Sequence, residues 1–81
     1  MMATPDTING FPIIGIWVTP QRGCQPAGRI IVVDRGPEYE ERYVVAWQGD
    51  GQTAWLESTY CIDIAEAERA FAAHIEREVR R

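Results

Sequence analysis

The chain has 81 residues, of which 46% are hydrophobic and 25% are charged, and this composition is globular rather than disordered. Its formal net charge is −4, so non-specific binding to nucleic acid is disfavoured. All of its basic residues are arginines, which provide flat, forked donors. No run approaches the roughly 20 apolar residues of a membrane-spanning helix, and no signal peptide is recognisable, so we expect a cytoplasmic protein. The length predicts a single domain over residues 1–81, in which residues 1–10 form a loose leader.

Four strands are predicted along the chain. The first covers residues 13–18, and the second covers residues 29–33, which contain four β-branched residues in succession. A long loop with two prolines and two glycines separates them. The third strand, 43–47, and the fourth, 53–60, flank Asp50-Gly51, a pair that accepts the positive φ angles of a tight hairpin turn.

This hairpin has more than one possible register. A two-residue turn places Trp47 opposite Ala54 and Val45 opposite Leu56, whereas a three-residue loop pairs Val45 with Trp55. A slip of one residue exchanges the two faces of a strand. The first register predicts that Val45 and Trp47 lie on one face of the sheet and that Trp55 lies on the other.

A C-terminal helix is predicted over residues 63–79. Asp63 is placed to cap it, with Glu66 three positions later as in a capping box. The apolar positions with helical spacing are Ile64, Ala67, Phe71, Ile75 and Val79. The order β-β-β-β-α with short connections predicts an α+β fold, a four-stranded antiparallel sheet with this helix packed on one face.

The predicted sheet has more apolar surface than one helix can cover. The second and third strands are apolar at consecutive positions, so both faces of the sheet are hydrophobic. The face away from the helix must be closed by curling of the sheet, covered by the leader and the long loop, or covered by another protein. A contact surface is therefore one of the predicted features.

Residues with catalytic potential are few. His74 falls on the helix without a hydroxyl or carboxylate placed for it by the sequence, and neither Cys24 nor Cys61 has a histidine at a recognisable spacing. We therefore expect that this protein is not an enzyme. A structural zinc site needs about four soft ligands, and no glycine-rich loop is placed to hold phosphate, so we expect neither metal nor cofactor. The cysteines are interpreted as reduced thiols.

The middle of the chain is strongly acidic. Eight acidic residues lie between Glu38 and Glu68, against Arg42 alone. Aromatic anchors surrounded by carboxylates are typical of surfaces that bind a basic partner protein. The predicted partner-binding residues are Glu38, Tyr39, Glu40, Glu41, Asp50, Trp55 and Glu57. The alternative interpretation is an ordinary solvated face.

The run WLESTY at 55–60, followed by IDIAEAERAF at 62–71, resembles the strand and capped helix that end many small proteins of phages and mobile elements. The compact, acidic anti-CRISPR proteins are among them. The resemblance implies a stoichiometric inhibitor that acts in the host cytoplasm and binds a Cas protein or the Cascade complex, thereby obstructing nucleic-acid binding. Anti-CRISPR proteins share no sequence signature, so no residue role is carried over from them.

Two other functions are compatible with the sequence. The first is a homodimer in which the open sheet faces pair, with a structural or regulatory role. The second is a small nucleic-acid-binding protein that combines Trp17 with Arg22, Arg29 and Arg35 on the sheet. The acidic net charge weighs against the second, because sustained phosphate binding requires an excess of cations.

Overall fold

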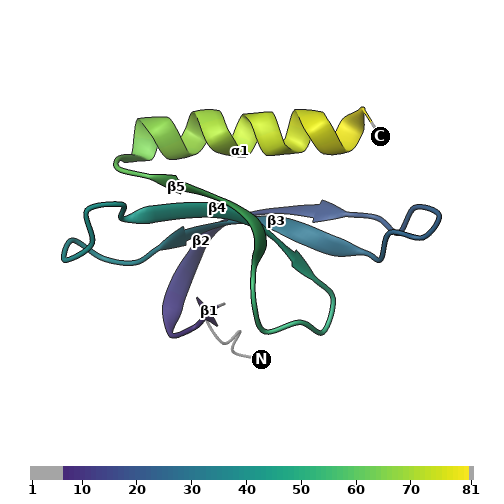
Figure 1. Cartoon of the computed structure of the whole chain (residues 1–81), viewed down its shortest axis with the longest axis horizontal. Helices are drawn as coiled ribbons and strands as arrows, with labels where there is room; N and C mark the ends of the chain where they lie inside the picture. Colours follow the sequence, from purple (N-terminus) through teal and green to yellow (C-terminus); the bar gives the residue numbers. More distant parts are fainter. Residues whose placement is uncertain (1–6, 81) are drawn as a thin grey trace, which may run out of the picture.

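A computed structural model describes residues 7–80. Within this range the elements are β1 (Thr7–Ile8), β2 (Phe11–Thr19), β3 (Gly28–Asp34), β4 (Tyr43–Gly49), β5 (Leu56–Cys61) and α1 (Ile64–Val79). The strands form one antiparallel sheet in chain order, and α1 lies lengthwise over one face of it (Figure 1). The predicted α+β fold with a C-terminal helix is confirmed, except that the described sheet has five strands and not four.

The additional strand, β1, lies in the segment that was predicted to be a loose leader. Ile8 pairs with Phe11 around Asn9-Gly10, whose φ angles are 52° and 82°. Asn-Gly is the preferred pair for a type I′ hairpin turn, so the sequence contained this signal. Ile8 is buried, and the hairpin therefore contributes to the core. The remainder of the predicted leader, residues 1–6, lies outside the described residues.

β2 is longer than the predicted strand and contains a bulge. Ile13 pairs with Val33 and Gly15 pairs with Val32, which leaves Ile14 as the extra residue. A Cβ atom on Gly15 would lie 3.2 Å from Cγ2 of Val32, so a glycine suits this crowded position. The bulge directs Ile14 toward the helix side of the sheet, whereas Ile13 packs on the opposite side.

The hairpin between β4 and β5 has neither of the predicted registers. The turn at residues 49–52 does form, closed by a 3.0 Å hydrogen bond from the Gln52 N–H to the Gly49 carbonyl. Pairing resumes only at Leu56, which lies opposite Trp47. Trp55 packs against the core on the face away from the helix, and this burial draws residues 52–55 out of the ladder.

The described chain forms a hydrophobic cluster on each face of the curled sheet. The cluster under α1 contains Ile30, Val32, Val45, Cys61 and Ala67, bordered by Trp17, Tyr43, Trp47, Ala70, Phe71 and Ile75. The cluster on the other face contains Ile8, Ile31, Val33, Val44 and Ala46, bordered by Phe11, Ile13 and Trp55. The predicted separation of Val45 and Trp47 from Trp55 is thus confirmed. The β1–β2 hairpin and Trp55 pack on the face of the sheet away from α1. Residues of the chain itself therefore cover much of the apolar surface that the helix leaves open.

α1 closely matches the predicted helix. Asp63 is its N-cap, and its Oδ1 accepts a hydrogen bond from the Glu66 N–H at 2.8 Å. The predicted apolar stripe packs on the sheet in its middle but not at its ends, because Ile64 and Val79 are 46% and 60% exposed. In the last two turns His74 and Glu78 are buried instead.

Candidate protein-interaction surface

The predicted partner-binding residues lie in separate places. Residues 38–41 belong to the β3–β4 loop, at the end of the sheet where α1 begins (Figure 1). Asp50 follows the opposite end of β4, about 20 Å away for a strand of this length. Trp55 is half-buried in the core, and Glu57 lies in a bulge of β5 with its carboxylate 3.9 Å from Arg77. The structure therefore brings together only Glu38, Tyr39, Glu40 and Glu41.

Tyr39 belongs to an aromatic cluster that the sequence did not reveal. The Arg35 guanidinium lies 4.3 Å from the centroid of the Tyr39 ring and 5.0 Å from that of Tyr60. Phe11 meets Tyr39 edge to face, with 5.6 Å between the ring centroids. Both tyrosines are 40% exposed. Tyr60 reaches this cluster through the pairing of β5 with β4, so no local spacing could have predicted it.

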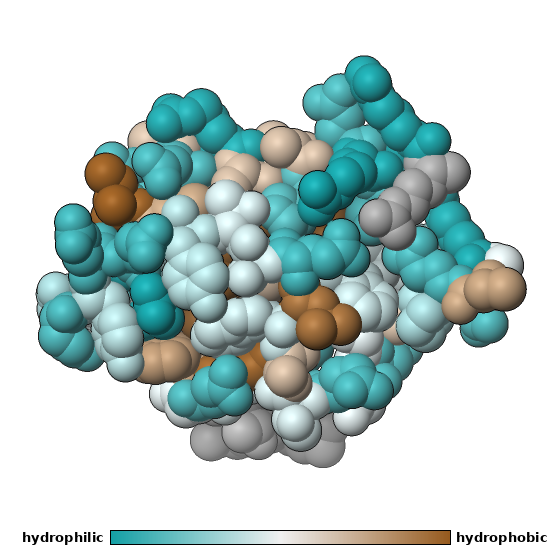
Figure 2. Space-filling model, in the orientation of Figure 1, coloured by the Kyte–Doolittle hydropathy of each residue, from teal (hydrophilic) through white to brown (hydrophobic). Residues whose placement is uncertain are grey.

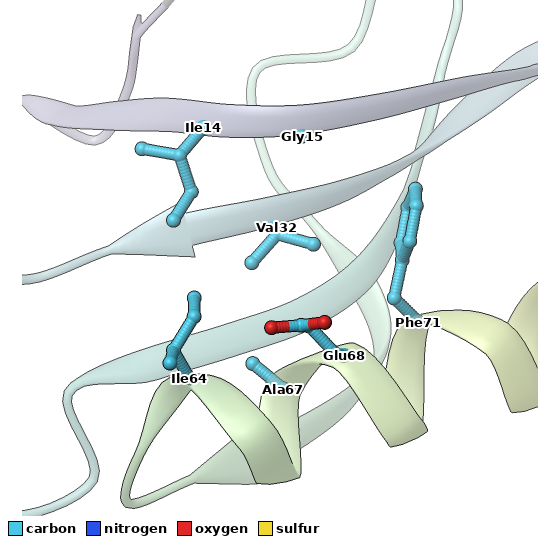
Figure 3. A pocket seen from close by; sticks show the side chains of 7 residues that line it. All are labelled: Ile14, Gly15, Val32, Ile64, Ala67, Glu68 and Phe71. Carbon is cyan, nitrogen blue, oxygen red and sulfur yellow. The ribbon is translucent and has the colours of Figure 1, made fainter.

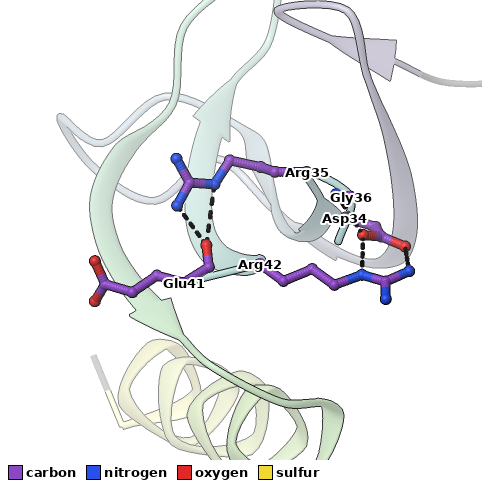
Figure 4. A network of polar contacts seen from close by, with 5 residues as sticks. All are labelled: Asp34, Arg35, Gly36, Glu41 and Arg42. Atoms are coloured by element: carbon purple, nitrogen blue, oxygen red, sulfur yellow. Dashed lines mark hydrogen bonds and ion pairs between the residues drawn. The ribbon is translucent and has the colours of Figure 1, made fainter. Parts of the chain in front are cut away.

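Two sets of hydrogen bonds hold the β3–β4 loop (Figure 4). Arg42 donates from Nε and Nη2 to the two carboxylate oxygens of Asp34, at 2.7 and 3.0 Å, and Asp34 Oδ1 also accepts from the Gly36 N–H at 2.9 Å. Arg35 donates from Nε, at 3.1 Å, and from Nη2 to the Glu41 carbonyl. The hydrogen bond from Arg42 lowers the pKa of Asp34, so this carboxylate is charged at neutral pH. The loop is thus ordered before any partner arrives.

Carboxylates lie at the same end of the molecule as the aromatic cluster, where Glu38, Glu40 and Glu41 flank Tyr39 in the β3–β4 loop. The pairing of Tyr43 with Cys61 places the β3–β4 loop beside the start of α1, which carries further acids. We call this region the acidic end, and it consists of Glu38, Glu40, Glu41, Asp63, Glu66 and Glu68. The opposite end of the molecule holds the β2–β3 loop and the end of α1, with Arg22, Arg77 and Arg80 (Figure 1). Each end also holds charges of the other sign, Arg35, Arg42 and Arg69 at the acidic end and Asp50, Glu76 and Glu78 at the opposite end, and the excess of carboxylates is confined to the acidic end.

An apolar groove of about 230 Å³ lies between β2 and the first half of α1 (Figure 3). Its lining consists of Ile14, Gly15, Val32, Ile64, Ala67, Glu68 and Phe71. α1 packs mainly on β3, β4 and β5, and this leaves Ile14 on β2 half-exposed. Figure 2 shows hydrophobic surface at the end of the molecule where the helix begins, among mostly hydrophilic side chains. Apolar surface therefore adjoins the acidic end.

His74 has a structural position. Its Nε2 lies 3.0 Å from the Thr59 hydroxyl, and its Nδ1 lies 3.1 Å from Nη2 of Arg77. A guanidinium can only donate, so Nδ1 accepts, and Nε2 carries the proton and donates to Thr59. Burial, and then the charge of Arg77, lowers the pKa of His74. The neutral ring therefore ties α1 to β5.

The other residues with potential for chemistry are dispersed. Cys61 is buried, which raises the pKa of its thiol, whereas Cys24 is exposed in the β2–β3 loop. Among residues 7–80, His, Cys, Asp and Glu side chains form no group of three or more that could hold a metal ion. No helix in this range has the length and apolar character needed to cross a membrane.

The structure does not assemble the alternative nucleic-acid platform. Trp17 borders the core cluster under α1. Arg22 donates to the Glu78 carbonyl at 3.0 Å, and Nε of Arg29 donates to Gln48 at 2.9 Å. Arg35 is engaged by the loop carbonyl and the two tyrosines. These cations hold the fold together and do not line a common surface with Trp17.

Comparison with known proteins adds no precedent for this surface. No protein-family model, curated protein or solved structure matches the chain.

Proposed function

We propose that this protein is a non-enzymatic inhibitor that binds a basic surface of a partner protein through its acidic end. The observation that carries the proposal is that Tyr39 and Tyr60, both half-exposed, lie over the Arg35 guanidinium, and that Glu38, Glu40 and Glu41 flank Tyr39 in the loop. Tyrosine is enriched among residues that dominate binding energy, because its ring buries a large area and its hydroxyl forms hydrogen bonds.

The order of the β3–β4 loop supports this proposal. A flexible loop loses conformational entropy when it binds, and that loss subtracts from the affinity. Here the Asp34–Arg42 pair and the bonds from Arg35 to the Glu41 carbonyl already fix the loop. The loop that carries Tyr39 therefore loses little further conformational entropy when a partner binds.

The charge of the acidic end favours one class of partner. A protein that handles nucleic acid has a groove lined with arginine and lysine, and a cluster of carboxylates is attracted to it as phosphates are. We infer that the acidic end occupies such a groove and competes with the nucleic acid. A Cas protein or the Cascade complex, the targets of anti-CRISPR proteins, is a partner of this kind.

The tyrosine pair supplies the most direct test. The protein is immobilised and used to capture partners from a bacterial lysate, in parallel with a Tyr39→Ala/Tyr60→Ala variant and a Tyr39→Phe/Tyr60→Phe variant. We expect the alanine variant to bind a captured partner about 30-fold more weakly, because it loses both aromatic contacts. The phenylalanine variant keeps the rings and should lose less. Nucleic acid added in excess should release the partner.

The proposal fails if all three proteins capture the same partner with equal affinity. It also fails if no partner is captured at any salt concentration. If the partner depends on the tyrosines but nucleic acid does not release it, the acidic end binds protein, and competition with nucleic acid is excluded.

A further inference from the structure

β2 leaves one edge of the sheet open. On the side away from β3, β1 pairs with β2 only at residues 11 and 12. Within the described chain, residues 13–19 therefore have a strand partner on one side alone. Among residues 7–80, no strand pairs with the outer N–H and C=O groups of this stretch, as at the edge of a sheet.

This edge lacks the charged residues that usually protect an edge strand. β2 contains no charged side chain from Phe11 to Thr19. Its protection is confined to its limits, with Pro12 and the Ile14 bulge on one side and Pro20 on the other. The stretch 15–19 between them pairs with β3 without a register shift, and we call it the regular stretch. By contrast β5, at the other edge, carries Glu57 in a bulge with a φ of 53°.

The side chains of the open stretch are apolar and exposed. Ile16 pairs with Ile31 and therefore lies on the face away from α1, as does Val18 two residues later. Ile16 is 43% exposed and Val18 is 71% exposed. An uncharged apolar strand edge of this kind favours association with another strand.

We propose that this edge pairs with the same edge of a second copy of the chain, antiparallel, about a twofold axis through Trp17. Ile16 then lies opposite Val18 of the partner subunit, and Gly15 lies opposite Thr19 of the partner subunit. A twofold interface requires a patch that complements itself, and an uncharged run of Ile16, Trp17 and Val18 meets this requirement.

The limits of the regular stretch select this register. Moving the axis to Ile16 would bring the bulged Ile14 into the ladder. Moving it to Val18 would bring in Pro20, which has no N–H to donate. An axis through Trp17 pairs the whole of 15–19 with itself and excludes both residues.

Electrostatics favours the antiparallel arrangement. β2 starts near the acidic end, since Ile13 pairs with Val33 close to the β3–β4 loop, and runs toward the opposite end. Antiparallel pairing therefore places the two acidic ends far apart, whereas parallel pairing would bring like charges together. The dimer presents two acidic ends that point in opposite directions. Residues 15–19 contribute nothing to the acidic end, so this interface is independent of the proposed function.

Sedimentation velocity over about a hundredfold range of protein concentration tests the dimer. We expect a concentration-dependent monomer–dimer equilibrium in the wild type. Val18→Lys should raise the dimer dissociation constant by about a hundredfold or more, because the substitution buries two charges in a symmetric interface. The matched control is Val79→Lys, which changes a similarly exposed valine on α1 and should leave the equilibrium unchanged. Circular dichroism melting checks that both variants fold.

Cross-linking tests the register. In a Cys24→Ser background, oxidation of an Ile16→Cys/Val18→Cys variant should give covalent dimers, because directly opposed residues are close enough for a disulfide. Neither single substitution should cross-link efficiently, since position 16 faces position 18. Efficient cross-linking by Ile16→Cys alone would overturn this register. Two results would overturn the proposal itself. The first is a protein that stays monomeric at all concentrations, even if it binds an added extended peptide at this edge. The second is a dimer whose dissociation constant does not change in the Val18→Lys variant.

Discussion

His74 is a buried residue of α1 that forms side-chain contacts with two other residues. Its two ring nitrogens contact Thr59 on β5 and Arg77 one turn further along α1. The charged groups that act on it are Arg77, Glu57 and Glu78. Burial and Arg77 lower its pKa, and this effect exceeds the opposing influence of the two glutamates. The folded protein consequently favours the neutral ring.

This preference predicts a pH dependence of stability. The ordinary pKa of the ring is 6.5, and the folded value is lower. Well above pH 6.5 the ring is neutral in both states, and His74 then subtracts nothing from the free energy of unfolding. As the pH falls below 6.5 the unfolded chain binds a proton that the folded protein excludes. Stability therefore decreases until the folded pKa is reached, by at most about 1.4 kcal/mol per pH unit.

Urea unfolding at a series of pH values from about 7.5 to 4.5 measures this effect. A His74→Gln variant, which cannot titrate, should show a flatter profile over the same range. Asp34 does not interfere, because its lowered pKa affects stability only below its ordinary value of 3.8. Identical slopes in the two proteins would show that His74 does not control the pH response.

The two ends of α1 are held by different kinds of hydrogen bond, one local in sequence and one long-range. At the start, Asp63 caps the helix through a local hydrogen bond to the Glu66 N–H. At the end, the β2–β3 loop packs against Glu78, with Arg22 donating to its carbonyl and Gln25 donating to its carboxylate at 3.2 Å. The Asp63 cap is encoded within four residues of sequence. The hydrogen bonds to Glu78 depend on a loop that lies more than 50 positions earlier in the chain.

The cap gives a prediction for the helix. Asp63→Ala should lower the free energy of unfolding by about 1 kcal/mol, because the Glu66 N–H loses its acceptor. Asp63→Asn keeps an acceptor oxygen and should stay within a few tenths of a kcal/mol of the wild type. Urea unfolding of the three proteins at neutral pH measures both changes. An equal loss in both variants would indicate that the negative charge at the helix start, and not the hydrogen bond, is what matters.

On the scale of the whole molecule, charge and apolar surface are separated. The acidic end gathers carboxylates from the β3–β4 loop and from the start of α1, and the opposite end carries Arg22, Arg77 and Arg80. The apolar edge of β2 runs between these two regions. The proposed partner site and the proposed dimer edge therefore lie on different parts of the molecule.

Charge reversal tests the role of the acidic end. Glu38→Arg/Glu40→Arg should slow association with the captured partner by about tenfold or more at low salt, because surface carboxylates steer the encounter. The difference should shrink as salt is added. Asp50→Arg/Glu76→Arg changes the net charge by the same amount away from the acidic end and serves as the control. Equal association rates for the two variants in surface-binding measurements would show that only net charge matters.

The predictable parts of this fold are those with local signals. The run of β-branched residues in β3, the Asp63 cap and the spacing of Ala67, Phe71 and Ile75 predicted the elements, and the loop at 38–41 was predicted as part of the surface. The Asn9-Gly10 turn was also encoded locally but was missed. The contact of Tyr60 with Arg35 could not be predicted, because Tyr60 reaches the β3–β4 loop only through the pairing of β5 with β4.

The amino-acid sequence by itself determined which segments become strands and helix, because helix caps, tight turns and side-chain periodicity act between neighbouring residues. Only the tertiary structure decided the register of β5, the burial of Trp55 and the placement of Tyr60 beside Arg35. Register is selected by which distant side chains bury together, and here Trp55 packs on the far face of the sheet while the ladder resumes only at Leu56.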